Sequence, residues 1–221
     1  MEQNIPRPPH RPTGASLATL IGVGIAVAGV VVLHVVRADL DPREAVMSHY
    51  ANGSSGIVMT LVFYAFGIAA LALAFRLFSA IDRQGVTRAF PYLMTIGGLA
   101  MLLAGAFEVD RPDAPETTGE VVHSNAAVAA FVLLVVSMAL ATMAMWRDDR
   151  WYQFRHTSAA ITVVAALGAA GSKISTGSSW TGLVQRVLAG AVLVWFVLVA
   201  RYVRSEQFRL ADGELPIDGG V

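Results

Sequence analysis

The chain has 221 residues, of which 55% are hydrophobic and 14% charged, and its formal net charge is zero. A water-soluble domain of this length needs more charge to cover its surface, so the composition predicts a protein dissolved in lipid. The neutral balance argues against a nucleic-acid-binding protein, which needs a basic face. Because cysteine is absent, disulfides, thiolate metal sites and cysteine nucleophiles are excluded.

Six apolar stretches reach, or nearly reach, the roughly 20 helical residues needed to cross a bilayer core. In chain order they cover residues 16–36, 57–78, 89–107, 125–146, 158–174 and 183–203. The first is longer than a signal-peptide core and is predicted to stay in the protein. The fifth is the weakest, because Thr162 interrupts a short apolar run, although Lys173 can extend its usable length by reaching the interface.

The distribution of basic residues predicts the orientation of these spans. Four basic residues lie on one side, in the first, third and fifth connections: Arg37, Arg43, Arg111 and Lys173. Eleven lie in or beside the tails and the other two connections: Arg7, Arg11, Arg76, Arg83, Arg88, Arg147, Arg150, Arg155, Arg201, Arg204 and Arg209. The positive-inside rule therefore predicts that both termini are cytoplasmic and that the protein lies in the plasma membrane.

We therefore predict an all-α, polytopic six-helix bundle over residues 15–205. A disordered cytoplasmic tail at 1–14 and a second cytoplasmic tail at 206–221 are expected to flank it. Small residues in three spans indicate close helix packing, namely Gly24, Ala28, Gly98, Gly105, Gly168 and Gly171.

The first outer connection includes Asp41-Pro42 and the run Ser48-His49-Tyr50, and its middle is predicted to form a short interfacial helix. Ser48 and His49 are neighbours in sequence and do not share a helix face, so they do not form a nucleophile pair. We retain both as candidate substrate-binding residues. His34, near the outer end of the first span, is interpreted as a hydrogen-bonded packing residue.

The connection between the third and fourth spans offers the clearest candidate chemistry. Glu108 and Asp110 follow the third span and His123 precedes the fourth, so a short antiparallel connection is expected to bring them together. Carboxylates beside a histidine can perform general acid–base catalysis, and the three are our candidate catalytic residues. Alternatively, His123 anchors a helix and the carboxylates are solvated. An outer-face metal site is a third option with little support, and neither a metal nor a cofactor is predicted.

Arg186 lies with Gln185 in the first outer turn of the sixth span. An ionisable residue there normally faces the bundle interior or a wet cavity, and a guanidinium suits bidentate pairing with Glu108 or Asp110. The alternative is that Arg186 extends to the outer interface. Both residues are candidate substrate-binding groups.

The sequence resembles the six-span membrane proteins of domain-of-unknown-function family 998. The resemblance covers most of residues 15–205. It rests on Asp41-Pro42 with Ser48-His49-Tyr50, on Gly105-x-Phe107-x-x-Asp110 followed by His123, and on Gly182-x-x-Gln185-Arg186. It implies the architecture and supplies no established activity.

Two functions remain open from the sequence. The first is an outward-facing polar pocket that binds, or acts on, a lipidic or isoprenoid-like molecule, by acid–base chemistry similar to that of terpene cyclases. The second is a non-enzymatic transporter, channel or structural membrane partner. Membrane lipids and a lipophilic small molecule are the expected partners, nucleic acid is not, and whether the protein is an enzyme is left open.

Overall fold

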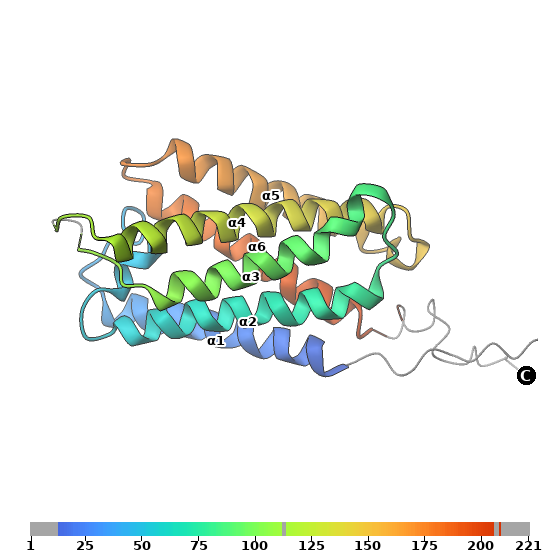
Figure 1. The fold of residues 1–221 in the computed structure, drawn as a ribbon, viewed down its shortest axis with the longest axis horizontal. Helices are drawn as coiled ribbons and strands as arrows, with labels where there is room; N and C mark the ends of the chain where they lie inside the picture. The colour runs from blue at the N-terminus through green and yellow to red at the C-terminus, as the bar shows by residue number, and fades with distance from the viewer. Residues whose placement is uncertain (1–12, 112–113, 206–207, 209–221) are drawn as a thin grey trace, which may run out of the picture.

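The protein is an elongated bundle of antiparallel helices (Figure 1). A computed structural model describes residues 13–111, 114–205 and 208. The six long helices are α1 (Thr13–Val36), α2 (Gly56–Ala80), α3 (Phe90–Ala106), α4 (Thr118–Met145), α5 (Arg155–Ile174) and α6 (Thr181–Tyr202). Three short 3-10 helices lie in the connections: η1 (Met47–Ala51), η2 (Gly85–Ala89) and η3 (Asp149–Trp151). Most of both predicted tails lies outside the described residues.

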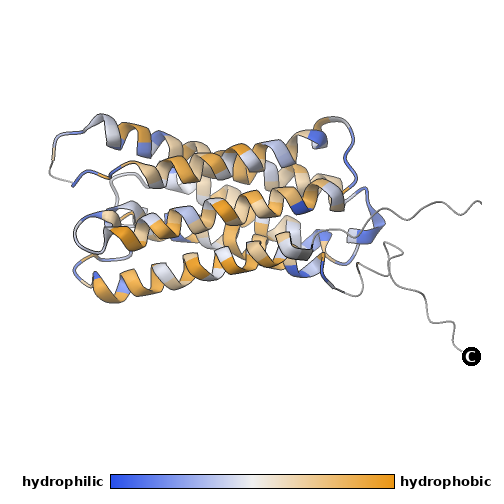
Figure 2. Cartoon of the chain, turned by 60° about the horizontal axis from the view of Figure 1, so that its bottom comes forward, coloured by the Kyte–Doolittle hydropathy of each residue, from blue (hydrophilic) through white to orange (hydrophobic). Residues whose placement is uncertain are grey.

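All six long helices are long and apolar enough to cross a membrane, which confirms the predicted all-α six-span architecture. Figure 2 shows the apolar residues along the helices and the polar residues gathered toward the two ends of the bundle. Many large apolar side chains on the helices are exposed, including Leu17 and Ile25 on α1 and Val163 and Leu167 on α5. Such an apolar surface would be unfavourable in water. It is stable in a bilayer, where the exposed side chains contact lipid hydrocarbon chains.

Each helix packs on the one before it, and α6 closes the bundle by contacting α1 as well as α5. The centre is filled by aromatic rings, with Phe66 of α2 placed edge-on to Phe131 of α4 and Phe196 of α6 at centroid distances of 5.9 Å. Rings in this arrangement pack densely, so the middle of the bundle is a filled core.

The helix connections divide the bundle into two ends. The acidic end comprises the connections at 37–55, 107–117 and 175–180, and the arginine end comprises those at 81–89 and 146–154 with the adjoining helix termini. Figure 1 shows the described parts of these two groups at opposite ends of the bundle. This confirms that the six spans alternate in direction, while the side on which each end lies remains a prediction.

The start of α4 differs most from the sequence-based prediction, which placed it at residue 125. The helix begins at Thr118 because the Thr117 hydroxyl accepts a hydrogen bond from the Glu120 backbone N–H at 3.3 Å, which caps the helix. As a result, Glu120 and His123 belong to the first turns of α4 and not to a loop.

The glycines predicted to lie at helix contacts divide into two groups. A Cβ on Gly105 would lie 2.7 Å from Phe63 Cβ, and one on Gly168 would lie 3.0 Å from Leu188 Cα, so both permit close approach. The prediction for Gly24 is wrong, because nothing lies within 4 Å of its added Cβ. Close contacts from α1 are made at Gly22, where a Cβ would lie 2.8 Å from the Ala65 carbonyl oxygen, and at Gly29, where one would lie 2.5 Å from Val62 Cγ2.

A buried polar cluster joins α5 to its neighbours. Ser158 Oγ lies 2.7 Å from Thr142 Oγ1 of α4 and accepts a hydrogen bond at 2.8 Å from Trp195 Nε1 of α6. Thr142 Oγ1 also lies 3.2 Å from Thr162 Oγ1. Thr162, which weakened the fifth span in the sequence, therefore contributes to a hydrogen-bonded contact between helices.

Candidate functional site

A cleft of about 700 Å³ opens at the acidic end between the start of α2 and the end of α3. We call it the α2–α3 cleft, and its polar lining includes Asn52, Thr60, Tyr64, Glu108, Asp110 and Arg111. Exposed Ile57 and Phe107 form part of its apolar wall. Gly105 creates space at this point, because a Cβ there would lie 3.1 Å from two ring atoms of Tyr64.

The two carboxylates predicted to be catalytic both line this cleft, but their surroundings differ. Asp110 Oδ2 accepts a hydrogen bond from the Thr117 backbone N–H at 2.6 Å, and Oδ1 accepts one from the Thr117 hydroxyl at 3.1 Å. The Asp110 backbone N–H donates to Glu120 Oε2 at 2.9 Å. Asp110 therefore organises the connection before α4, whereas the exposed Glu108 carboxylate makes no hydrogen bond to the residues described.

The third candidate catalytic residue, His123, lies beside α2 and α3 and does not line the cleft. It is buried, with Nδ1 2.7 Å from the Ala104 carbonyl oxygen and its ring placed edge-on to Phe63 at 5.2 Å. The carbonyl is an acceptor, so Nδ1 carries the proton and donates. These contacts are those of a residue that anchors α4 to α2 and α3, the alternative left open by the sequence.

Gln185 belongs to a second cluster, in which the first connection docks on α6. Its Oε1 accepts a hydrogen bond from the Met47 backbone N–H at 2.6 Å, and the Leu183 N–H donates to the Arg43 carbonyl at 2.9 Å. Gly182 permits this contact, because a Cβ there would overlap the Ala45 carbonyl oxygen and lie 2.7 Å from that of Pro42. The Gly182-x-x-Gln185-Arg186 motif is thus a platform for the first connection.

Arg186 completes this docking cluster. Its Nη1 donates to the carbonyl oxygens of Ala45 at 2.8 Å and Gly182 at 2.9 Å, and its Nε donates to His34 Nε2 at 3.1 Å. The guanidinium lies 5.4 Å from the Tyr50 ring centroid. Its Nη2 is buried and has no hydrogen-bond partner among the described residues, which leaves two N–H donors for water or another polar group.

The contact with Arg186 also shows which ring nitrogen of His34 carries the proton. Since guanidinium nitrogens can only donate, His34 Nε2 must be the acceptor and is unprotonated. The ring proton is then on Nδ1, which donates to the Val30 carbonyl at 2.7 Å. The interpretation of His34 as a hydrogen-bonded packing residue agrees with this geometry, although its partner on α6 was not foreseen.

His49 and Ser48 lie in η1, beside the α2–α3 cleft. His49 lines a second pocket of about 370 Å³ together with Arg37 and Arg111. Burial lowers the pKa of His49 below its ordinary value of 6.5, against the smaller opposing effect of the Glu120 carboxylate. Ser48 is half-buried and lines neither of these two pockets.

The structure therefore brings some of the sequence-derived candidates together and separates others. Glu108 and Asp110 share one cleft, His49 lies in the adjoining pocket, and Gln185 and Arg186 hold the first connection. Among the described residues Arg186 forms no ion pair with a carboxylate, and no group of three His, Asp or Glu side chains is placed to hold a metal. The sequence did not identify Tyr64 and Thr60, which lie within an apolar span.

The fold defines the chain as a multi-pass membrane protein with polar clefts at its acidic end. It belongs to the family described as "protein of unknown function (DUF998)", which matches residues 20–202. No curated protein and no solved structure matches the chain.

Proposed function

We propose that the α2–α3 cleft binds the polar head of a lipidic or isoprenoid-like molecule. The observation that carries this proposal is the Glu108 carboxylate, which has no hydrogen bond to any described residue and lies in a cleft of about 700 Å³ with an exposed apolar wall. A ligand with a hydroxyl or amine head would donate to Glu108 while its chain lay against Ile57 and Phe107. Few polar anchors in an otherwise apolar site are typical of small-molecule pockets.

If the protein is also an enzyme, fewer residues of the cleft can serve as the catalytic acid. Protonating an alkene or epoxide needs a carboxylic acid free to donate, and Asp110 is held by two hydrogen bonds from Thr117. His123 is buried against Ala104 and does not line the cleft. Glu108 is consequently the preferred candidate for an acid, with Asp110 as the residue that positions the segment carrying it.

The alternative is a non-enzymatic transporter, channel or structural partner. The edge-on contacts of Phe66 with Phe131 and Phe196 fill the centre of the bundle, and a continuous pore would need these rings to separate. That packing favours a binding site at one end over a channel through the middle.

Binding is tested by thermal unfolding of the detergent-purified protein with farnesol, geranylgeraniol and dodecylamine as probes. We expect at least one probe to raise the melting temperature of the wild type and to lose this effect in Glu108→Gln. The matched control is Glu116→Gln, which removes an exposed acid that does not line the cleft. Equal stabilisation of both variants and the wild type would contradict the proposal.

Catalysis is tested separately by incubating the protein with polyprenyl alcohols and an epoxidised isoprenoid. Products formed by the wild type and lost in Glu108→Gln would support acid catalysis. Identical product profiles for wild type, Glu108→Gln and Asp110→Asn would exclude catalysis by either carboxylate and leave only the binding function.

A further inference from the structure

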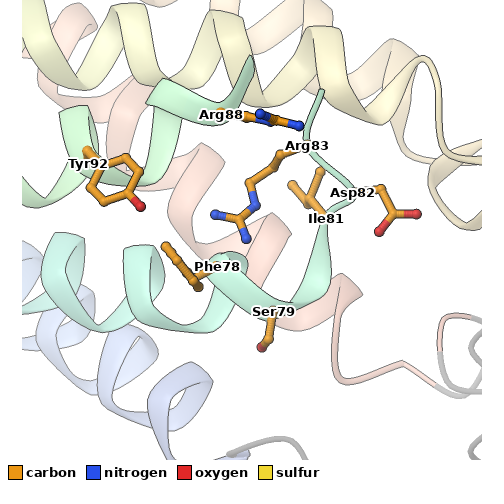
Figure 3. A pocket seen from close by; sticks show the side chains of 7 residues that line it. All are labelled: Phe78, Ser79, Ile81, Asp82, Arg83, Arg88 and Tyr92. Atoms are coloured by element: carbon orange, nitrogen blue, oxygen red, sulfur yellow. The ribbon is translucent and has the colours of Figure 1, made fainter. Parts of the chain in front are cut away.

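A cavity of about 460 Å³ at the arginine end is separate from the α2–α3 cleft and from the pocket that His49 lines. It lies where α2 ends and the connection to α3 begins, and it is lined by Phe78, Ser79, Asp82, Arg83, Arg88 and Tyr92, together with Ile81. Figure 3 shows Arg83 extending from the connection into the space beside Phe78 and Tyr92, with Arg88 on the far side of Arg83 from Phe78.

The short connection is folded so that it holds the two arginines in place. Gln84 N–H donates to Thr87 Oγ1 at 3.0 Å, and that hydroxyl donates to the Gln84 carbonyl at 2.8 Å. Thr87 and Ile81 are buried, and Gly85 takes the positive φ of 54° that the turn requires. Arg83 and Arg88 therefore extend from an ordered turn.

The two arginines that line this cavity are not paired with its carboxylate, Asp82, in the part of the chain that the structure describes. Among the described residues neither Arg83 nor Arg88 forms an ion pair, and the Arg83 guanidinium lies 4.0 Å from the Phe78 ring centroid. Asp82 lines the same cavity, but its carboxylate points away from Arg83 in Figure 3 and lies 3.7 Å from Arg150 Nη2. Two arginines thus line one open cavity, an arrangement that favours an anion with several oxygen acceptors.

The cavity also lies at the expected boundary between hydrocarbon and water. Phe78 and Tyr92 are near the ends of candidate spans, and their side chains are 45% and 58% exposed. The Phe78 ring is edge-on to Tyr92 at 6.0 Å, so the two form an exposed aromatic surface beside the charges. Aromatic residues at span ends typically mark the headgroup level of a bilayer.

From this combination we infer that the cavity binds the phosphate of an anionic phospholipid headgroup. Arg83 and Arg88 bind the phosphate oxygens, and Tyr92 and Phe78 contact the glycerol backbone and the first part of the acyl chains. Basic pockets between membrane helices bind such headgroups by these interactions. In the orientation predicted from the sequence, this end faces the cytoplasmic leaflet, which carries the anionic lipids. The inference does not depend on the function proposed for the α2–α3 cleft.

The test is lipid binding by the full chain in detergent micelles, measured by native mass spectrometry with phosphatidylglycerol and phosphatidylcholine. We expect the wild type to bind phosphatidylglycerol about tenfold more tightly, because each arginine near the headgroup adds to the attraction. Arg83→Gln with Arg88→Gln should reduce this preference to about twofold or less. The matched control, Arg147→Gln with Arg204→Gln, removes the same charge from exposed positions outside the cavity and should keep the preference.

Two further measurements distinguish binding in the cavity from general charge attraction and from loss of the fold. Circular dichroism melting in a zwitterionic detergent checks that each variant is folded. The variant Arg83→Lys with Arg88→Lys should retain part of the preference for phosphatidylglycerol, because the charge remains without bidentate geometry. Equal loss in the cavity and control variants would overturn the inference in favour of non-specific attraction. Competition by millimolar inorganic phosphate that fully displaces the lipid would assign the cavity to free phosphate instead.

Discussion

The two ends of the bundle use polar residues in different ways. At the acidic end, hydrogen bonds join segments far apart in sequence, such as Gln185 with Met47 and Asn52 with the Asp110 carbonyl. At the arginine end the hydrogen bonds of the 81–89 connection are local, between Gln84 and Thr87, and rings pack the 146–154 connection, with Trp151 5.3 Å from Tyr202 and 5.1 Å from Phe208. Many polar side chains at the acidic end therefore form hydrogen bonds that hold the connections in place. Aromatic packing at the second end leaves guanidinium groups such as Arg83 and Arg88 available to the surroundings.

This contrast predicts that substitutions in the docking platform of the acidic end have the largest effects. Gly182→Ala places a Cβ against two backbone carbonyls of the first connection, and we expect overpacking to lower stability by about 2–3 kcal/mol. Gly190→Ala is the control on the same helix, because nothing lies within 4 Å of its added Cβ. Thermal unfolding in detergent measures both, and equal melting temperatures would mean that the first connection is not docked as described.

Removing the Arg186 guanidinium tests the docking of the first connection on α6 by taking away its hydrogen-bond donors. Arg186→Gln leaves His34 Nε2 and the Ala45 carbonyl without a donor, which should cost about 1–3 kcal/mol. Trypsin should then cleave after the exposed Arg43 faster than in wild type, because the connection is released. Lys173→Gln removes an exposed cation from the same end and should change neither the melting temperature nor the cleavage. Unaltered cleavage in Arg186→Gln would contradict the docking role.

Substitutions in the connection between α3 and α4 are expected to lower stability less than those in the docking platform. In Asp110→Asn the amide keeps one acceptor and loses the other, so we expect a loss of about 1 kcal/mol and faster hydrogen exchange at the Thr117 amide. Exchange measured by mass spectrometry over residues 114–120 checks this, with Glu116→Gln as the control. Protection that is the same in Asp110→Asn and wild type would show that these bonds do not order the connection.

The smallest predicted effect is a pH dependence at the acidic end. The pKa of His49 is lowered in the folded protein, so between that value and 6.5 the unfolded state binds more protons. Its contribution to stability is therefore complete above pH 6.5 and is lost as the pH falls through the folded pKa. His49→Gln should reduce the difference in melting temperature between pH 7.5 and pH 5. An unchanged difference would mean that other groups cause the pH dependence.

Much of the architecture follows from the sequence, because apolar length alone identifies the six spans. The start of α4 was misplaced because its first turns are polar, and only the cap at Thr117 reveals them. Among candidate site residues, Glu108 and Asp110 line one cleft because one short segment contains both, whereas His123, expected beside them, does not line it. The partners of Arg186 could not be predicted, because two of them are backbone carbonyls and the third, His34, lies on a helix far away in sequence.

The polar cluster of Ser158, Thr142 and Trp195 has a consequence for biogenesis. Of the six candidate spans, α5 has the lowest hydropathy and the smallest buried share, so it enters a bilayer from the translocon with the weakest drive of its own. Its hydrogen bonds are to α4, which precedes it, and to α6, which follows it. We therefore expect stable integration of α5 to depend on α6, with the last two spans entering the membrane as one helical hairpin.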